Sequence, residues 1–282
     1  MRLCNDFMLQ IISMMRQCLI FPALMAGAIF ATGCHSGIQQ QPAWKNYLAD
    51  NQLEGCLMLY DNMHDQVKVY PLQAATQRHA PAQSFVLFSS LVGLESGVIA
   101  DTSSLLRTPQ NDTLTMAEWF RSDPAGLNEW LASHIQPQVM RLWIDSVHYG
   151  AWMPADTATL QALKQAFWQN GHLRISPDEQ LGFLIHLYFH ELPFHERPQR
   201  LLQQLMTRET TPRYTLSYIS SAFPTDTSSQ SWILGWEEEN KHPYFFSVYL
   251  ESKLLSAEQL QAKAITLAKQ WLRDQGFFEG KK

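Results

Sequence analysis

The sequence predicts a single α+β domain behind a short leader, and three observations predict it. The 282 residues are 46% hydrophobic and 12% aromatic but only 17% charged, a composition that supplies a large core and argues against disorder. Strand-like segments fall into two groups, one near the start and one near the end. A block of helix-like segments separates these groups, and such segregation is typical of α+β domains.

The charge balance excludes one class of partner. The formal net charge is -5 and the sequence pI is about 6.0. The longest run of basic residues is the terminal pair Lys281-Lys282. Binding to nucleic acid requires clustered lysine and arginine to neutralise phosphates, so we expect no nucleic-acid partner.

The N-terminus has the pattern of an export signal. Residues 18–33 carry no charge and follow Arg16, as in a secretory signal peptide. The apolar stretch is shorter than the roughly 20 residues that a membrane-spanning helix needs. Translation could equally begin at Met14 or Met15, because residues 1–13 add little that a signal peptide requires.

The end of this stretch, Ala31-Thr32-Gly33-Cys34, resembles a bacterial lipobox. The resemblance implies a signal peptide over residues 1–33 and a lipid on Cys34 that holds the protein to a membrane. Ala31 replaces the usual leucine. The residues after Cys34 are His35 and Ser36, without the aspartate that retains lipoproteins in an inner membrane, so we expect the periplasmic face of a Gram-negative outer membrane. The alternatives are an uncleaved anchor and a cleaved signal without lipid.

The mature chain then begins with the lipidated cysteine and a polar tether over residues 34–50, followed by one domain over residues 51–282. Residues 53–60 and 66–70 read as two strands around a turn. Cys56 lies in the first strand and has no cysteine partner in the mature chain. We therefore expect a small buried thiol.

The middle of the chain is helical. Residues 84–99 are apolar or small on nearly every helical face, which predicts a helix in the interior of the domain. Residues 115–207 are helix-rich, with breaks at proline, glycine and polar residues. Their helices are expected to start near Leu127, Pro137, Ala158, Pro177 and Glu196.

The last part returns to strands and closes with a helix. Strand-like runs cover residues 214–220, 231–237 and 244–251. Ser256, followed three residues later by Gln259, predicts a capping box at the start of the terminal helix.

The motifs of known catalytic chemistry are missing. Serine acyl transfer needs a nucleophile with a base beside it, often as S-x-x-K with a K-T-G strand. None of the nine lysines has a serine three residues before it or a serine or threonine after it. G-x-S-x-G is also absent.

No metal or cofactor site is predicted either. His186 and His190 are four residues apart, but the order H-x-x-x-H-E differs from the zinc motif H-E-x-x-H. We interpret them as ordinary, partly exposed side chains. The run Glu237-Glu238-Glu239 is expected to be a solvated turn between strands.

Two longer stretches nonetheless resemble one family. Residues 81–99 (PAQSFVLFSSLVGLESGVI) resemble the nucleophile helix of the class D β-lactamases and of related β-lactam-responsive sensor domains. Residues 167–180 (FWQNGHLRISPDEQ) are similar to the family's F-W-L-x-G-x-L-R-I-S-x-x-E-Q block. Tyr149-Gly150 resembles the family's Y-G-N element, and residues 232–236 its W-x-x-G-W strand.

The resemblance runs in order from about residue 50 to residue 277. It implies a five-stranded antiparallel sheet flanked by helices, with a helical subdomain over about residues 100–207.

The catalytic positions of the family are substituted in this chain. The serine nucleophile falls on Gln83 and the carboxylated lysine base on Val86. The S-x-V element keeps its serine as Ser122 but has Pro124 in place of valine.

The other catalytic positions of the family are also substituted. The asparagine of Y-G-N falls on Ala151, and K-T-G falls on Ile219-Ser220-Ser221. No arginine lies near residues 261–264, where the family has one that binds the substrate carboxylate. The tryptophan beside the modified lysine is retained, as Trp168.

These substitutions imply a pseudoenzyme. A glutamine amide cannot attack an acyl carbon and valine cannot take a proton, and losing such a catalytic unit costs about 10⁶-fold in a serine hydrolase. We therefore expect a lipoprotein that binds an envelope protein or a peptidoglycan fragment. Its cleft would be lined by Gln83, Val86, Ser122, Ile219 and Ser220.

Three alternatives remain. The first is a divergent β-lactamase or peptidoglycan hydrolase that uses another serine, although Ser84, Ser89 and Ser90 lack a lysine one turn further on. The second is a sensor that binds β-lactams or peptidoglycan fragments without acylation. The third is a structural module of an envelope assembly.

Overall fold

A seven-stranded sheet forms the centre of the molecule. The structure, a computed structural model, describes residues 37–152 and 166–282. The strand order is β1-β3-β2-β11-β10-β9-β8, in which only β1 and β3 are parallel. The strands are β1 (Gly37–Gln40), β2 (Glu54–Asp61), β3 (Gln66–Tyr70), β8 (Thr207–Thr210), β9 (Thr215–Pro224), β10 (Ser229–Glu239) and β11 (His242–Ser252).

Helices and two small sheets complete the domain. The helices are α2 (Lys45–Ala49), α3 (Val86–Glu95), α4 (Met116–Ser122), α5 (Pro124–His134), α6 (Pro137–Val147), α7 (Pro177–Tyr188), α8 (Glu196–Met206) and α9 (Ala257–Asp274). Short 3₁₀ turns are η1 (Pro42–Trp44), η2 (Leu72–Ala74) and η3 (Ala82–Phe85). The small sheets pair β4 (Leu105–Arg107) with β5 (Thr113–Thr115), and β6 (Ala151–Trp152) with β7 (Leu173–Arg174).

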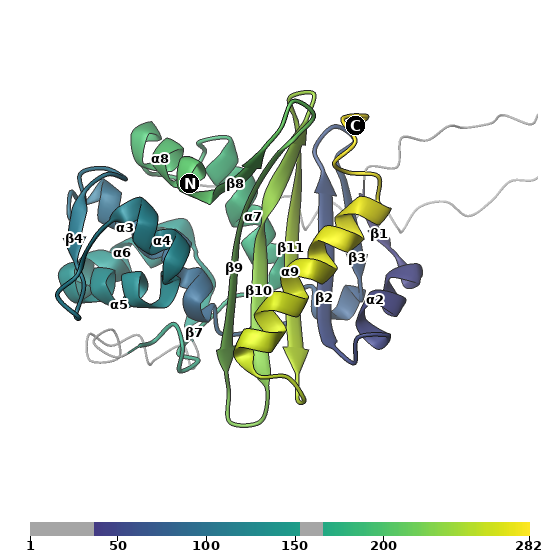
Figure 1. Cartoon of the computed structure of the whole chain (residues 1–282), viewed down its shortest axis with the longest axis horizontal. Coiled ribbons are helices and arrows are strands. Elements are labelled where there is room, and N and C mark those ends of the chain that lie inside the picture. The colour runs from purple at the N-terminus through teal and green to yellow at the C-terminus, as the bar shows by residue number, and fades with distance from the viewer. Residues whose placement is uncertain (1–36, 153–165) are drawn as a thin grey trace, which may run out of the picture. The chain divides into compact units, whose positions relative to one another are not determined.

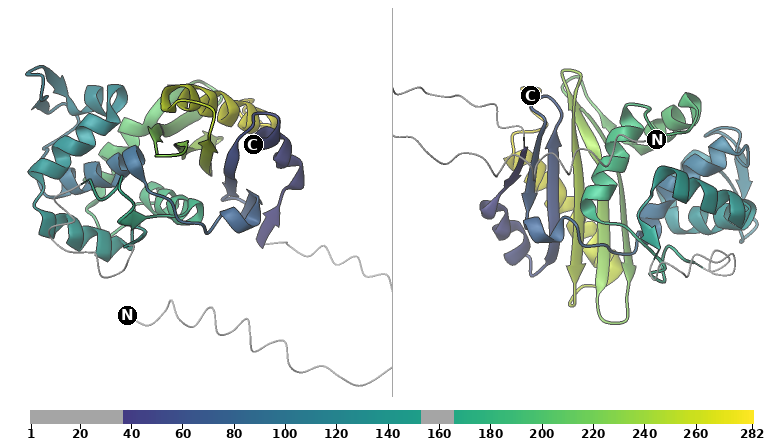
Figure 2. Two further views of the ribbon diagram at one scale, coloured as in Figure 1. Left: turned by 90° about the horizontal axis from the view of Figure 1, so that it is seen from below. Right: turned by 180° about the vertical axis from the view of Figure 1, so that it is seen from behind.

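The sheet separates two hydrophobic cores. Helix α9 crosses one face over β9, β10 and β11 (Figure 1). Helix α7 packs on β2, β10 and β11, and the helices around α3 lie beyond it (Figure 2). Because side chains alternate along a strand, Leu216 of β9 belongs to the α9 core and Ile219 to the other core.

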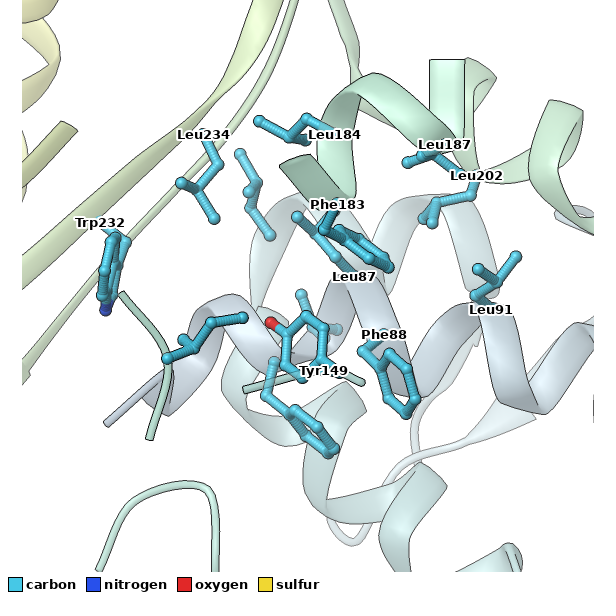
Figure 3. Close-up of a cluster of buried hydrophobic side chains, with 14 of the residues drawn as sticks. Leu87, Phe88, Leu91, Tyr149, Phe183, Leu184, Leu187, Leu202, Trp232 and Leu234 are labelled. Atoms are coloured by element: carbon cyan, nitrogen blue, oxygen red, sulfur yellow. The ribbon is translucent and has the colours of Figure 1, made fainter. Parts of the chain in front are cut away.

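The predicted interior helix is confirmed. Every residue of α3 from Val86 to Leu94 is buried, and the helix packs against α5, α6 and α8. Leu87, Phe88 and Leu91 lie near side chains from α7 and α8 in the interior (Figure 3). A helix that is apolar all round can be stable only in such a position.

The capping box of the terminal helix is also confirmed. The Ser256 Oγ accepts a hydrogen bond from the Gln259 N–H at 3.2 Å, and the Gln259 Oε1 accepts one from the Ser256 N–H at 3.0 Å. Leu260, Ala264 and Trp271 are buried on the side that faces the sheet.

The retained glycine of W-x-x-G-W has a steric explanation. A Cβ on Gly235 would lie 2.1 Å from the backbone oxygen of Ser217 on the neighbouring strand β9. Only glycine allows β9 and β10 to approach this closely at that point.

The sheet is larger than predicted, since β1 and β8 extend the expected five strands to seven. Residues 37–49, which we expected to be a polar tether, form β1, η1 and α2. Trp44 explains the difference, because it is buried edge-on against Trp271 with ring centroids 4.9 Å apart. A single large aromatic ring can anchor a short polar segment to a core.

Helix α7 departs from the predicted helical subdomain. It falls within residues 100–207 but packs on the sheet through β2, β10 and β11. The helices that began near Leu127, Pro137, Pro177 and Glu196 are present as α5 to α8. The segment expected near Ala158 lies outside the described residues.

One expected turn is a strand. Glu237 and Glu239 lie within β10 and are fully buried, so the prediction of a solvated turn is wrong. The chain reverses instead at Asn240 and Lys241, which both have positive φ, as a tight hairpin requires. The last residues cover this end of the sheet, and the Lys282 N–H donates to the Glu239 Oε2 at 2.9 Å.

Two further findings concern burial. Cys56 is buried as predicted, and burial raises the pKa of its thiol to about 12. Among the helices of residues 37–152 and 166–282, none combines the length and apolar character needed to cross a bilayer.

Candidate ligand-binding cleft

A cleft of about 350 Å³ opens beside β9. Its walls come from η3, from the junction of α4 and α5, from β8 and β9, and from the first turns of α9. The lining residues are Gln83, Arg121, Ser122, Asp123, Pro124, Ala125, Arg208, Tyr218, Ser220, Ser221, Ala222 and Gln261.

The structure brings together five of the nine positions singled out in the sequence. Gln83 from η3, Ser122 and Pro124 from the α4–α5 junction, and Ser220 and Ser221 from β9 line this one cleft. Residues from three separate parts of the chain thus meet where the resemblance places a catalytic centre.

The expected lining differs at two positions. Val86 and Ile219 have no exposed surface and belong to the hydrophobic core. An apolar side chain gains free energy by burial, so neither residue lines the cleft as expected.

Trp168 and Ala151 also lie away from the cleft lining. Trp168 is buried and stacks on Phe85 at a centroid distance of 5.7 Å. Its indole Nε1 has no hydrogen-bond partner among the described residues, an arrangement that costs about 1–3 kcal/mol. Ala151 pairs with Arg174 in the small β6–β7 sheet.

Two arginines in the cleft were not predicted from the sequence. Arg121 ends α4 and is exposed, and Arg208 lies on β8 and is partly buried. The Arg208 Nε–H donates to the backbone oxygen of Tyr218 at 3.0 Å, and the guanidinium lies 5.8 Å from the centroid of that tyrosine ring. No motif in the sequence connects the two arginines, because only the fold places α4 beside β8.

The cleft lining has more positive than negative side chains. In the described part of the chain, neither Arg121 nor Arg208 forms an ion pair. The single carboxylate of the lining, Asp123, caps α5 by accepting a hydrogen bond from the Gly126 N–H at 3.0 Å. The lining therefore carries two positive charges and one negative charge.

The backbone of β9 forms one edge of the cleft. Strand β8 pairs with β9 only between Thr215 and Ser217. Beyond this point side chains take the place of a strand, since Arg208 binds the oxygen of Tyr218 and the Gln261 Nε2 donates to the Ser220 oxygen at 3.1 Å. Gln261 occupies the region where an arginine was expected by resemblance.

The cleft lining differs from serine acyl-transfer centres that pair a serine with lysine or histidine. The described lining contains three serines but neither of these bases, and its titratable groups besides the arginines are Asp123 and Tyr218. The serines considered as relocated nucleophiles, Ser84, Ser89 and Ser90, are fully buried in η3 and α3 and do not line the cleft.

Comparisons with known proteins point to one family. The chain is 24% identical over 261 residues to the β-lactamase OXA-3 of Pseudomonas aeruginosa, covering 88% of this chain and 91% of the relative. It is 25% identical over 215 residues to the probable β-lactamase YbxI of Bacillus subtilis, covering 73% and 78% of the two chains. No family model matches the chain.

A solved structure gives the same result. The crystal structure of the class D β-lactamase YbXI from Nostoc superimposes with a TM-score of 0.73 at 26% identity. The match covers 82% of this chain and 97% of that structure.

Proposed function

Because class D β-lactamases are homologues of this chain and share its fold, we propose that it is a noncatalytic binding protein of the bacterial envelope. In this proposal the cleft beside β9 has kept its position and lost its chemistry. Its ligand is a peptidoglycan fragment or a segment of an envelope protein.

One observation carries the proposal: Gln83 and Val86 stand where the resemblance places the nucleophile and the base. Gln83 lines the cleft, but its amide cannot form an acyl-enzyme. Val86 is fully buried and has no group that can accept a proton. The unpartnered Nε1 of Trp168 supports the same conclusion, because the family places a modified lysine beside this tryptophan.

The location follows from the N-terminal pattern. A lipid on Cys34 would precede the first described residue, Gly37, by three residues. Three extended residues span at most about 10 Å. The domain would therefore be held close to the membrane surface, where it could reach partners in the adjacent envelope.

The test is a search for a covalent adduct. The purified full-length chain is incubated with a fluorescent penicillin and analysed by intact-mass spectrometry, with a class D β-lactamase as the positive control. We expect no fluorescent band and no added mass, and no penicillin hydrolysis above the buffer rate. A stoichiometric adduct on any serine would overturn the proposal and identify the relocated nucleophile.

A further inference from the structure

We propose that Arg121 and Arg208 form a carboxylate-binding site in the cleft. This inference rests on the proposed noncatalytic function and names the chemical class of the ligand. The arginines come from the end of α4 and from β8. They are not at the position of the K-T-G lysine, which falls on Ile219 here, nor within residues 261–264, where the resemblance places the substrate-binding arginine.

The first argument is the unbalanced charge. Two guanidinium groups in one cleft repel each other, and burial together with the charge of Arg121 lowers the pKa of Arg208. The nearby Asp123 already accepts a hydrogen bond from the backbone of α5. An anion between the two arginines would relieve this repulsion.

The second argument is the orientation of the donors. The Arg208 Nε–H and the Tyr218 ring hold this guanidinium in place, which leaves its terminal Nη groups for a ligand. Arg121 makes no hydrogen bond within the described residues, so all of its donors remain available. A planar guanidinium presents paired N–H groups that match the two oxygens of a carboxylate.

The third argument is independent of charge. Ser221 lines the cleft with only 2% of its surface exposed, and its Oγ has no hydrogen-bond partner in the described structure. The buried Oε1 of Gln83 is also unpartnered. Buried polar groups are normally paired, so the Ser221 hydroxyl, which lines the cleft, is available to a polar ligand. The hydroxyl can donate to a carboxylate.

A short peptide with a free C-terminus combines these features, since it has a carboxylate and amide N–H groups. A penicillin also has a carboxylate and an amide. The cleft volume of about 350 Å³ lies at the lower end of the range for small-ligand sites. It suits the end of a peptide or one compact acid.

The experiment compares acids with their neutral counterparts. The full-length chain is titrated calorimetrically at low ionic strength with N-acetyl-alanyl-alanine and its C-terminal amide, benzylpenicillin and its methyl ester, and inorganic phosphate. We expect the acids to bind and the amide and ester to bind at least about tenfold more weakly, since hydrogen bonds to a charged carboxylate are stronger than those to a neutral group. The tighter of the two acids identifies the source of the carboxylate.

Variants assign the effect to the cleft. Arg121→Gln and Arg208→Gln should each weaken acid binding about tenfold or more. Arg107→Gln, an exposed arginine on β4 outside the cleft, is the matched control and should have no effect. Because Arg121 is exposed, its substitution tests the site even if the Arg208 variant does not fold.

Several results would overturn the site. These are equal binding of acids and neutral forms, no binding of any acid, wild-type affinity in both cleft variants, or tighter binding of phosphate than of either acid. A covalent penicillin adduct would instead overturn the noncatalytic function. The arginine variants would still test the carboxylate-binding site separately.

Discussion

Two buried carboxylates lie two residues apart at the end of β10, on the same face of the strand. Burial, reinforced by the charge of Glu239, raises the pKa of Glu237 to about 9. Burial also raises the pKa of Glu239, but backbone N–H groups of Lys282 and Gly280 more than offset it, so that pKa is lower than usual. Near neutral pH, Glu237 is therefore protonated beside an ionised Glu239.

This arrangement predicts that Glu237→Gln stabilises the protein most at alkaline pH. A carboxyl with a folded-state pKa near 9 and an unfolded-state pKa near 4.5 contributes stability below pH 4.5. That contribution is lost as the pH rises towards 9. The gain from Glu237→Gln should be larger at pH 8 than at pH 5 by up to about 4 kcal/mol, measured by urea unfolding.

The neighbouring residue provides the control. Glu239→Gln removes a carboxylate whose charge is stabilised by backbone donors, so it should destabilise the protein at neutral pH. An equal effect of Glu237→Gln at both pH values would show that this carboxyl is not held neutral in the folded state.

The burial of a single residue could be predicted from the sequence only where its near neighbours indicate it. Cys56 was correctly expected to be buried, because its strand is apolar on both sides. The glutamate run was misread as a turn, because its burial depends on the C-terminal residues that fold over it. A run of three glutamates contains no local signal that a segment distant in the sequence will cover it.

At the scale of elements, the terminal helix α9 supplies both a face of the core and one wall of the cleft. Its first turn is held by the capping box of Ser256 and Gln259. Gln261, one turn later, donates to the backbone oxygen of Ser220 at 3.1 Å. The start of the helix is therefore coupled to the edge of β9.

We expect Ser256→Ala to lower the free energy of unfolding by about 1 kcal/mol, the usual value for a lost N-cap. This loss in the free energy of unfolding is measured by chemical denaturation. Thr266→Ala is the matched control, because this hydroxyl is on the exposed side of α9 and bonds only the Ala262 oxygen of its own helix. Equal losses in the two variants would contradict a specific role for the cap.

Helices and strands were predicted well where their pattern is local. The helix containing residues 84–99 and the capping box of α9 depend on neighbouring residues, and both are present in the structure. Strands β1 and β8 were missed because each is only four residues long and is stabilised by its neighbour in the sheet. The position of α7 on the sheet is likewise set by packing between distant elements.

At the scale of the whole molecule, His79 links two distant parts of the chain. Its backbone exchanges two hydrogen bonds with Ile175, at 2.9 and 2.8 Å. Its ring stacks on Tyr249 of β11 with centroids 3.7 Å apart. Burial is the main cause that lowers the pKa of His79 to about 4.

The position of His79 predicts a loss of global stability in acid. A histidine with a folded-state pKa near 4 and an unfolded-state pKa near 6.5 contributes stability above pH 6.5, which is lost as the pH falls through 4. His79→Phe keeps an aromatic ring against Tyr249 and removes the titration. The Tm of the variant should therefore fall less than that of the wild type between pH 7 and pH 4, as measured by calorimetry.

The exposed His242 at the start of β11 is the control for this effect. It forms no ion pair with any described residue. His242→Phe should leave the acid-dependent fall in Tm unchanged. The same fall in the wild type and in His79→Phe would mean that other groups cause the acid sensitivity.

The sequence by itself determined the α+β class, the interior helix and the capped terminal helix. These properties depend on residue type and on short-range pattern. The tertiary structure alone decided that Arg121 and Arg208 face one cleft, that Val86 and Ile219 are buried in the core, and that Glu237 is buried beside Glu239. Charge and burial at these positions depend on contacts between segments far apart in the chain, and such contacts have no local pattern.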